Sequence, residues 1–154
     1  MTLKYLEHFL IQTADFHATV DWYERVLGLS RGYTPDFRFP VQWMYLGDRD
    51  VLHITQGGAK VSENRLRYNG QESQAESGSG VVDHIAFRCK GLPETIDHLR
   101  KSGIRFRERM VNEQGLYQIF LIDPNGVKIE LNFANAEAID NGIVPELMAS
   151  DLPA

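Results

Sequence analysis

The sequence predicts an α+β fold made of two successive βαβββ modules. Two similar segments, residues 6–11 (LEHFLI) and 82–87 (VDHIAF), each carry a histidine in the third position. In both halves of the chain the spacing of apolar residues changes in the same order, from strand-like to helix-like and back. Hydrophobic residues make up 43% of the 154 residues, so the chain can form one compact domain or two tightly packed half-units.

The first half begins with a strand and a helix. Residues 5–12 alternate as a half-buried strand that places His8 on the same face as Leu10. A helix follows and runs to about Leu27, and Gly28 is expected to end it in the left-handed conformation. Three more strands are expected at residues 29–33, 41–46 and 51–56, the last two joined by a turn at 47–50.

The second half repeats this order. Residues 81–88 form a strand that places His84 on the same face as Ala86. Pro93 suits the first turn of the next helix, which Gly103 ends. Three more strands are expected at residues 104–109, 117–122 and 127–133, the last two joined by the turn 123–126 (DPNG), whose residues favour tight turns.

The chain therefore divides into four parts. A stretch between the halves is rich in Ser and Gly and has no apolar periodicity, which indicates a flexible connector. The parts are the first module (1–70), the connector (71–80), the second module (81–133) and a C-terminal tail (134–154) that either wraps a neighbour or is loose.

Four side chains of a metal-binding type recur at equivalent positions. His84 follows His8 by 76 residues, and Glu130 follows His53 by 77. Because one helix cannot cover both faces of a sheet, we expect the two four-stranded sheets to face each other around an open, barrel-like cavity, with all four side chains inside. Imidazole and carboxylate groups together suit Fe, Ni, Zn, Mn or Co. The pattern predicts one divalent metal per site, and hence an enzyme.

The charge and composition of the chain argue against some kinds of binding partner. The formal net charge of −5 argues against a nucleic-acid or anionic-membrane surface, since both need concentrated Lys and Arg. No apolar run approaches the roughly 20 residues of a membrane span, and the N-terminus lacks a signal-peptide segment. Cys89 is the single cysteine, and no residue near it in the sequence marks it as activated, which favours a buried structural thiol over a nucleophile. We expect a cytoplasmic protein that binds a small-molecule substrate.

The duplicated βαβββ order, together with residues 21–29 (DWYERVLGL) and 120–131 (FLIDPNGVKIEL), resembles the vicinal oxygen chelate superfamily. That superfamily includes glyoxalase I, extradiol ring-cleaving dioxygenases, methylmalonyl-CoA epimerase, fosfomycin-resistance transferases and bleomycin-binding proteins. The resemblance covers nearly all of residues 5–133 and implies a homodimer.

By this resemblance the metal ligands fall on His8, His53, His84 and Glu130. The glyoxalase I branch often has a carboxylate at the position of His53. This residue is therefore either a fourth ligand or an acid/base group beside the metal. Glu130 and His53 are the candidates for moving a proton during catalysis.

The resemblance favours a glyoxalase-like isomerase, lyase or epimerase, whose substrate chelates the metal through vicinal oxygens. An Fe(II) extradiol-type dioxygenase is the alternative. In that branch a tyrosine usually lies ten residues before the glutamate, where this chain has Phe120. A non-catalytic protein of the bleomycin-resistance type is a second alternative, although such members have usually lost the metal ligands.

Residues outside the metal pattern are also candidates. Arg65, Arg67 and Tyr68 either bind an anionic substrate group or belong to a solvated loop. His17 and His98 lie on predicted helices and are interpreted as surface or packing residues. Four strand residues near the predicted cavity are candidate substrate contacts: Trp43, Tyr45, Tyr117 and Gln118.

Overall fold

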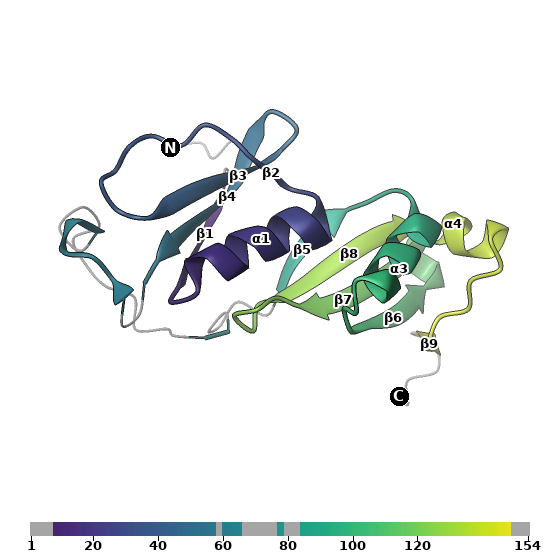
Figure 1. Ribbon diagram of the computed structural model, residues 1–154. Coiled ribbons are helices and arrows are strands. Elements are labelled where there is room, and N and C mark those ends of the chain that lie inside the picture. The colour runs from purple at the N-terminus through teal and green to yellow at the C-terminus, as the bar shows by residue number, and fades with distance from the viewer. Residues whose placement is uncertain (1–7, 58–59, 66–76, 79–83, 149–154) are drawn as a thin grey trace, which may run out of the picture. The chain divides into compact units, whose positions relative to one another are not determined.

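The computed structural model describes residues 8–57, 60–65, 77–78 and 84–148. The chain divides into two compact units, Met1–Ser77 and Gly78–Ala154 (Figure 1). Both units have the βαβββ order, so the predicted α+β fold of two such modules is confirmed. No helix in the described part of the chain is long and apolar enough to cross a membrane.

The first unit is a four-stranded sheet with one helix. The strand order is β1-β4-β3-β2, in which β1 runs parallel to β4 and the other neighbours are antiparallel. Its elements are β1 (Phe9–Thr13), α1 (Phe16–Leu27), β2 (Ser30–Arg31), β3 (Val41–Leu46) and β4 (Arg49–Gln56).

Helix α1 covers one face of this sheet. Val20 and Tyr23 are almost fully buried at 1% and 0% exposure, as expected for one stripe of an amphipathic helix. Gly28 ends the helix with φ of 70°, and its N–H donates to the carbonyl of Glu24. The strand residues of this core are Ile11, Met44, Leu52 and Ile54.

The second unit has a five-stranded sheet in the order β5-β8-β7-β6-β9. Strand β5 runs parallel to β8, as β1 does to β4 in the first unit. The elements are β5 (His84–Arg88), α3 (Leu92–Lys101), β6 (Phe106–Val111), the 3-10 turn η2 (Asn112–Gln114), β7 (Leu116–Ile122), β8 (Lys128–Ala134), α4 (Asn135–Asp140) and β9 (Leu147–Met148).

The repeat seen in the sequence also appears in the way the strands of the two units pair. Leu10 is opposite His53 in the first unit, and Ala86 is opposite Glu130 in the second. In each unit the histidine of the sequence pattern lies two residues before the first member of that pair. The two modules therefore place their metal-type side chains at equivalent points. That the two sheets face each other stays a prediction.

Several predicted boundaries are wrong. The strand predicted at 29–33 contains only Ser30–Arg31, and the strand predicted at 104–109 is shifted to Phe106–Val111. The prediction of a wrapping or loose tail is also wrong for part of the tail, because the chain forms α4 and then adds β9 to the sheet beside β6. The predicted connector lies mostly outside the described residues.

One carboxylate of the C-terminal tail attaches the tail to helix α3 of the same unit. The side chain of Glu137 in α4 accepts hydrogen bonds from the N–H groups of Gly91 and Leu92, both at 2.8 Å. These donors belong to the first turn of α3, which has no partner for them within the helix. A negative charge there also interacts favourably with the helix dipole. The tail thus caps the helix of its own unit.

Candidate functional site

In the first unit, two histidines of the sequence pattern lie in contact. The rings of His8 and His53 stack with their centroids 3.8 Å apart, and Trp43 stacks on His53 at 4.3 Å. Since β4 lies between β1 and β3, the His53 ring is held between the other two. His53 is buried, with 8% exposure. Its ring therefore has little freedom to rotate.

A carboxylate that the sequence did not reveal completes this group. The Oδ2 atom of Asp50 lies 2.8 Å from Nε2 of His53. This hydrogen bond lowers the pKa of Asp50. An oriented imidazole next to a carboxylate is a common arrangement around bound metals and in acid/base catalysis.

A β-bulge brings Asp50 to this face of the sheet. Asp50 is three residues before His53, so regular alternation would place the two side chains on opposite faces. The pairing shifts instead: Tyr45 is opposite Asp50, and Met44 is opposite Leu52. One extra residue in β4 has no partner, which restores both side chains to one face.

These three side chains fit a divalent metal. Ligand atoms of His8, Asp50 and His53 all lie within 4.8 Å of one another. Within the described part of the chain, the buried Nδ1 atom of His8 has no hydrogen-bond partner. A buried polar atom in that state costs about 1–3 kcal/mol, which a metal or substrate contact would recover. Imidazole and carboxylate are suitable ligands for first-row divalent ions.

The second unit brings together the other two residues of the pattern. Nε2 of His84 lies 3.1 Å from Oε2 of Glu130, and Glu130 is 7% exposed. The other carboxylate oxygen, Oε1, accepts hydrogen bonds from the side-chain amides of Gln118 at 2.8 Å and Asn132 at 2.7 Å. Glu130 is therefore held by donors on both oxygens when His84 is protonated at Nε2.

An arginine fixes the direction of this network. The guanidinium of Arg109 donates to Oε1 of Gln118, through Nε at 2.8 Å and Nη2 at 2.5 Å. Because that oxygen faces Arg109, the amide nitrogen of Gln118 must face Glu130. The cation thereby orients the glutamate carboxylate through one intervening side chain.

The four predicted substrate contacts lie in different places. Trp43 stacks on His53, and Gln118 binds Glu130. The hydroxyl of Tyr45 donates to the carbonyl of Tyr33 at 2.8 Å.

Tyr117 lies on the opposite face of β7 from Gln118. It is fully buried and donates to the carboxylate of Glu108 at 2.9 Å. Burial raises the pKa of Tyr117, and the hydrogen bond to Glu108 adds to this. The structure thus places Tyr117 in the core of the second unit.

A cavity of about 350 Å³ opens beside the histidines of the first unit. Five of its residues were not predicted as part of a site: Phe37, Phe39, Val41, Asp50 and Thr55. Phe37 and Phe39 alternate within an irregular segment, where periodicity gives no signal. The lining residues are His8, Leu10, Phe37, Phe39, Val41, Trp43, Asp50, His53, Thr55 and Arg65.

Arg65 belongs to this cavity rather than to a solvated loop. Its exposure is 4%, so the solvated interpretation is wrong for this residue. Its Nη2 donates to Oε1 of Gln12 at 2.8 Å. Arg67 and Tyr68 lie outside the described residues.

Side chains away from the two groups behave as packing or surface residues. His17 and His98 are exposed on α1 and α3. Cys89 is partly buried, and burial raises the pKa of its thiol. A raised pKa reduces the thiolate fraction and hence the reactivity of Cys89.

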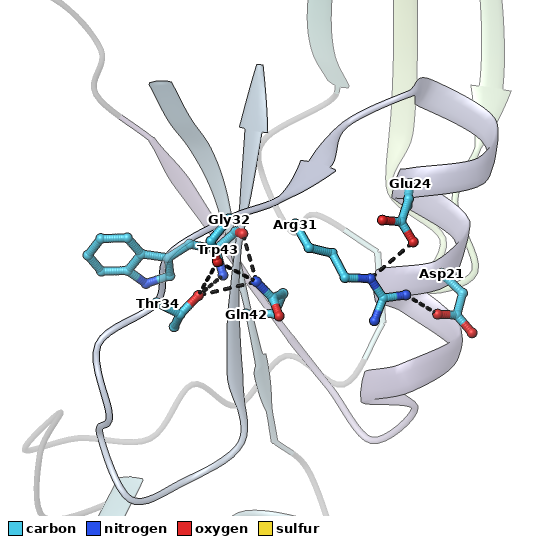
Figure 2. Close-up of polar contacts among 7 residues, drawn as sticks. All are labelled: Asp21, Glu24, Arg31, Gly32, Thr34, Gln42 and Trp43. Carbon is cyan, nitrogen blue, oxygen red and sulfur yellow. Dashed lines mark hydrogen bonds and ion pairs between the residues drawn. The ribbon is translucent and has the colours of Figure 1, made fainter. Parts of the chain in front are cut away.

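Polar contacts hold the strand that carries Trp43 (Figure 2). The Thr34 hydroxyl accepts hydrogen bonds from the N–H of Trp43 at 3.0 Å and from the side-chain amide of Gln42 at 3.2 Å. Arg31 pairs with Asp21 and Glu24 of α1. These contacts attach the segment after β2 to β3 and tie β2 to α1, which steadies the wall of the cavity.

Similarity to known proteins agrees with this architecture. Residues 5–131 match the model of the Glyoxalase/Bleomycin resistance protein/Dioxygenase superfamily. No curated protein compared with the chain matches it.

Solved structures with the same fold include three informative ones. A glyoxalase/bleomycin resistance protein/dioxygenase from Nocardioides has 18% identity and a TM-score of 0.63, with 87% of this chain and 85% of that chain covered. The fosfomycin resistance protein FosX from Listeria monocytogenes has 14% identity and a TM-score of 0.62, with 88% and 98% covered. Lactoylglutathione lyase from Agrobacterium tumefaciens has 16% identity and a TM-score of 0.61, with 86% and 96% covered.

At these identities the structural likeness shows the fold alone. The family match, in contrast, spans both βαβββ modules and all four residues of the histidine–glutamate pattern. The chain therefore belongs to the glyoxalase/bleomycin resistance protein/dioxygenase superfamily.

Proposed function

We propose that the protein is a divalent-metal-dependent enzyme of the glyoxalase type, which isomerises, cleaves or epimerises a small substrate bound through two adjacent oxygens. One observation carries this proposal: each unit pairs two metal-type side chains at equivalent register. His8 contacts His53, and His84 contacts Glu130. Membership of a superfamily that includes glyoxalases and dioxygenases supports it.

We propose His8, His53, His84 and Glu130 as the residues that hold the metal. A bound divalent ion would act as a Lewis acid that polarises a carbonyl and stabilises developing negative charge on oxygen. Nδ1 of His8 is buried and has no hydrogen-bond partner among the described residues, which supports a role for that side chain as a ligand.

Asp50 prepares His53 for either of its two predicted roles. When Nε2 of His53 donates to Asp50, the lone pair of the ring is on Nδ1. That nitrogen can then bind a metal or take up a proton. Carboxylates that accept from a ligand histidine commonly fix its tautomer and raise its basicity.

Glu130 is the proposed carrier of the substrate proton, a role for which its carboxylate would have to detach from the metal. Its carboxylate is held by two amide donors, and a neighbouring histidine lies within hydrogen-bond distance. Such fixed groups can move a proton between adjacent carbon atoms without large rearrangement. The surroundings of Glu130 therefore suit isomerase or lyase chemistry.

The partner of Glu130 across the sheet argues for this chemistry over ring cleavage. Phe120 is opposite Glu130 and offers no hydroxyl group. The tyrosine that the ring-cleaving branch usually has there is thus missing, and Tyr117 faces the core instead.

The proposal is tested by metal analysis followed by turnover. We expect about one metal ion per chain in protein purified without an affinity tag, as for a single catalytic site. After reconstitution with Ni, Zn or Mn, hemithioacetals or α-hydroxy-carbonyls should be converted. Oxygen uptake with catechols under Fe(II) would instead establish the dioxygenase, and failure to bind any metal would leave a binding protein.

A further inference from the structure

The cavity of the first unit has an aromatic wall that the proposed chemistry does not use. Phe37 and Phe39 stack with centroids 5.6 Å apart, and Phe37 lies 6.2 Å from Trp43. Both phenylalanines are only half-buried, although they line the cavity together with Leu10, which is 49% exposed. Exposed apolar rings in a concave site are typical of ligand contacts.

The backbone that presents these rings is strained. Arg38, between the two phenylalanines, has φ of 58°, a conformation that residues other than glycine rarely adopt. Its N–H donates to Asp36 at 2.9 Å, and its carbonyl accepts from the side chain of Asn64 at 2.9 Å. Strained backbone of this kind persists where neighbouring contacts enforce it, and it concentrates at binding sites.

The same cavity contains one buried positive charge. Arg65 is 4% exposed, lines the cavity and is oriented by the side chain of Gln12. The planar guanidinium matches a carboxylate in shape and charge. Asp50 also lines the cavity, where its carboxylate is hydrogen-bonded to His53. The cavity thus presents an aromatic wall, the Arg65 cation, one carboxylate and two histidines to a small molecule.

We propose that this cavity binds an aromatic carboxylate, with its ring against Phe37, Phe39 and Trp43 and its carboxylate towards Arg65. The inference rests on the proposed function only where it concerns the reaction of the bound molecule. Binding by the aromatic wall and by Arg65 does not require a metal. The volume of about 350 Å³ is at the small end of the range for ligand sites, which suits a molecule with a single ring.

Binding of simple probes to the full chain tests the inference. Benzoate, cyclohexanecarboxylate, benzamide and acetate would be titrated by calorimetry, with and without EDTA. Benzoate should bind about three- to tenfold more tightly than cyclohexanecarboxylate, the range that aromatic pairing contributes. It should also bind more tightly than acetate and benzamide, and EDTA should leave these differences in place.

Substitutions test the contributions of the aromatic wall and of the Arg65 charge to binding separately. The double variant Phe37→Leu/Phe39→Leu should reduce the preference for benzoate over cyclohexanecarboxylate, with Trp43 left as the remaining ring of the wall. Tyr33→Leu is the matched control, because Tyr33 is 76% exposed and is not among the lining residues. Arg65→Gln should weaken benzoate by about tenfold or more, as for loss of a charged hydrogen bond. The same variant should bind benzamide as the unaltered chain does, which also shows that it folds.

Equal binding of benzoate and cyclohexanecarboxylate, or no binding of either, would overturn the inference whatever the metal content. A chain that binds benzoate but no metal would keep the inference and refute the proposed enzyme. The two failures are thus distinguishable.

Discussion

The two units share the order of four strands and the register of their parallel strand pair, but they surround their equivalent side chains differently. His53 is held between two rings and contacts a carboxylate, whereas Glu130 is held by two amides and a histidine. The comparison teaches that equivalent positions of the functional groups do not require equivalent neighbours. The first unit has an aromatic cavity beside its pair, and the second has a hydrogen-bond network.

One inserted residue accounts for much of the difference. Strands β7 and β8 pair without a shift from Leu116 to Ile122, while β3 and β4 shift between Met44 and Tyr45. Once the extra residue is taken into account, Asp50 corresponds to Lys128, because Tyr45 is opposite Asp50 as Ile122 is opposite Lys128. The second unit therefore has no counterpart of the carboxylate beside His53.

The largest expected effect is loss of metal when either unit loses its proposed ligand. His84→Ala and His53→Ala should each lower metal affinity strongly. The loss should exceed the about 10–100-fold that is typical when a residue that only hydrogen-bonds a metal ligand is removed. Calorimetric titration with Zn or Ni measures this. His98→Ala and His17→Ala are matched controls on exposed helix positions of the same units and should bind as the unaltered chain does. Unchanged affinity in His84→Ala would exclude the second unit from the site.

Asp50→Asn should have the next largest effect. The amide keeps the shape of the side chain but loses the charge that orients His53, so metal affinity or turnover should fall about 10–100-fold. Asp48→Asn, in the same turn but exposed, is the control. If both variants behave alike, the contact between Asp50 and His53 contributes nothing to the site.

Deletion of Val51 would make the first unit resemble the second. Without Val51, Asp50 would lie two residues before His53, and regular alternation along β4 would keep both side chains on one face. We therefore expect a smaller loss of metal affinity than for Asp50→Asn, and Asp50→Asn should still lower the affinity in the deletion variant. Circular dichroism should confirm that the sheet is retained. A loss as large as that of Asp50→Asn would show that the bulge, and not alternation alone, positions the Asp50 carboxylate.

The smallest expected effect concerns the strained residue of the cavity wall. Arg38→Gly should change the free energy of unfolding by less than about 1 kcal/mol, because glycine adopts positive φ without strain but loses more entropy. Arg38→Val should destabilise the chain by about 1–3 kcal/mol. Urea unfolding measures both. Equal stability of the two variants would mean that the conformation at Arg38 is not enforced.

Sequence reasoning succeeded where a pattern is local or repeated. The bounds of β3, the end of α1 at Leu27 and the βαβββ order follow from periodicity and from Gly28. The bulge could not be predicted, since one extra residue next to a turn does not disturb the apolar pattern enough to be seen.

Long-range contacts explain the other omissions. Strand β9 gains its conformation by pairing with β6, and its two residues carry no strand signal alone. Arg65 is buried by neighbours distant in sequence, such as Gln12. The cavity wall at Phe37 and Phe39 depends on a backbone conformation that the residue types do not favour.

The pairing of β9 with β6 has a consequence for how the protein behaves in solution. Without β9, the six residues of β6 would form an outer strand with backbone groups available to another chain. Open strands of this kind are templates for edge-to-edge aggregation. The register partners Arg109–Leu147 and Met110–Met148 cover part of this edge. The C-terminal segment thus covers part of an edge that could otherwise pair with another chain, on the strand whose Arg109 orients Gln118.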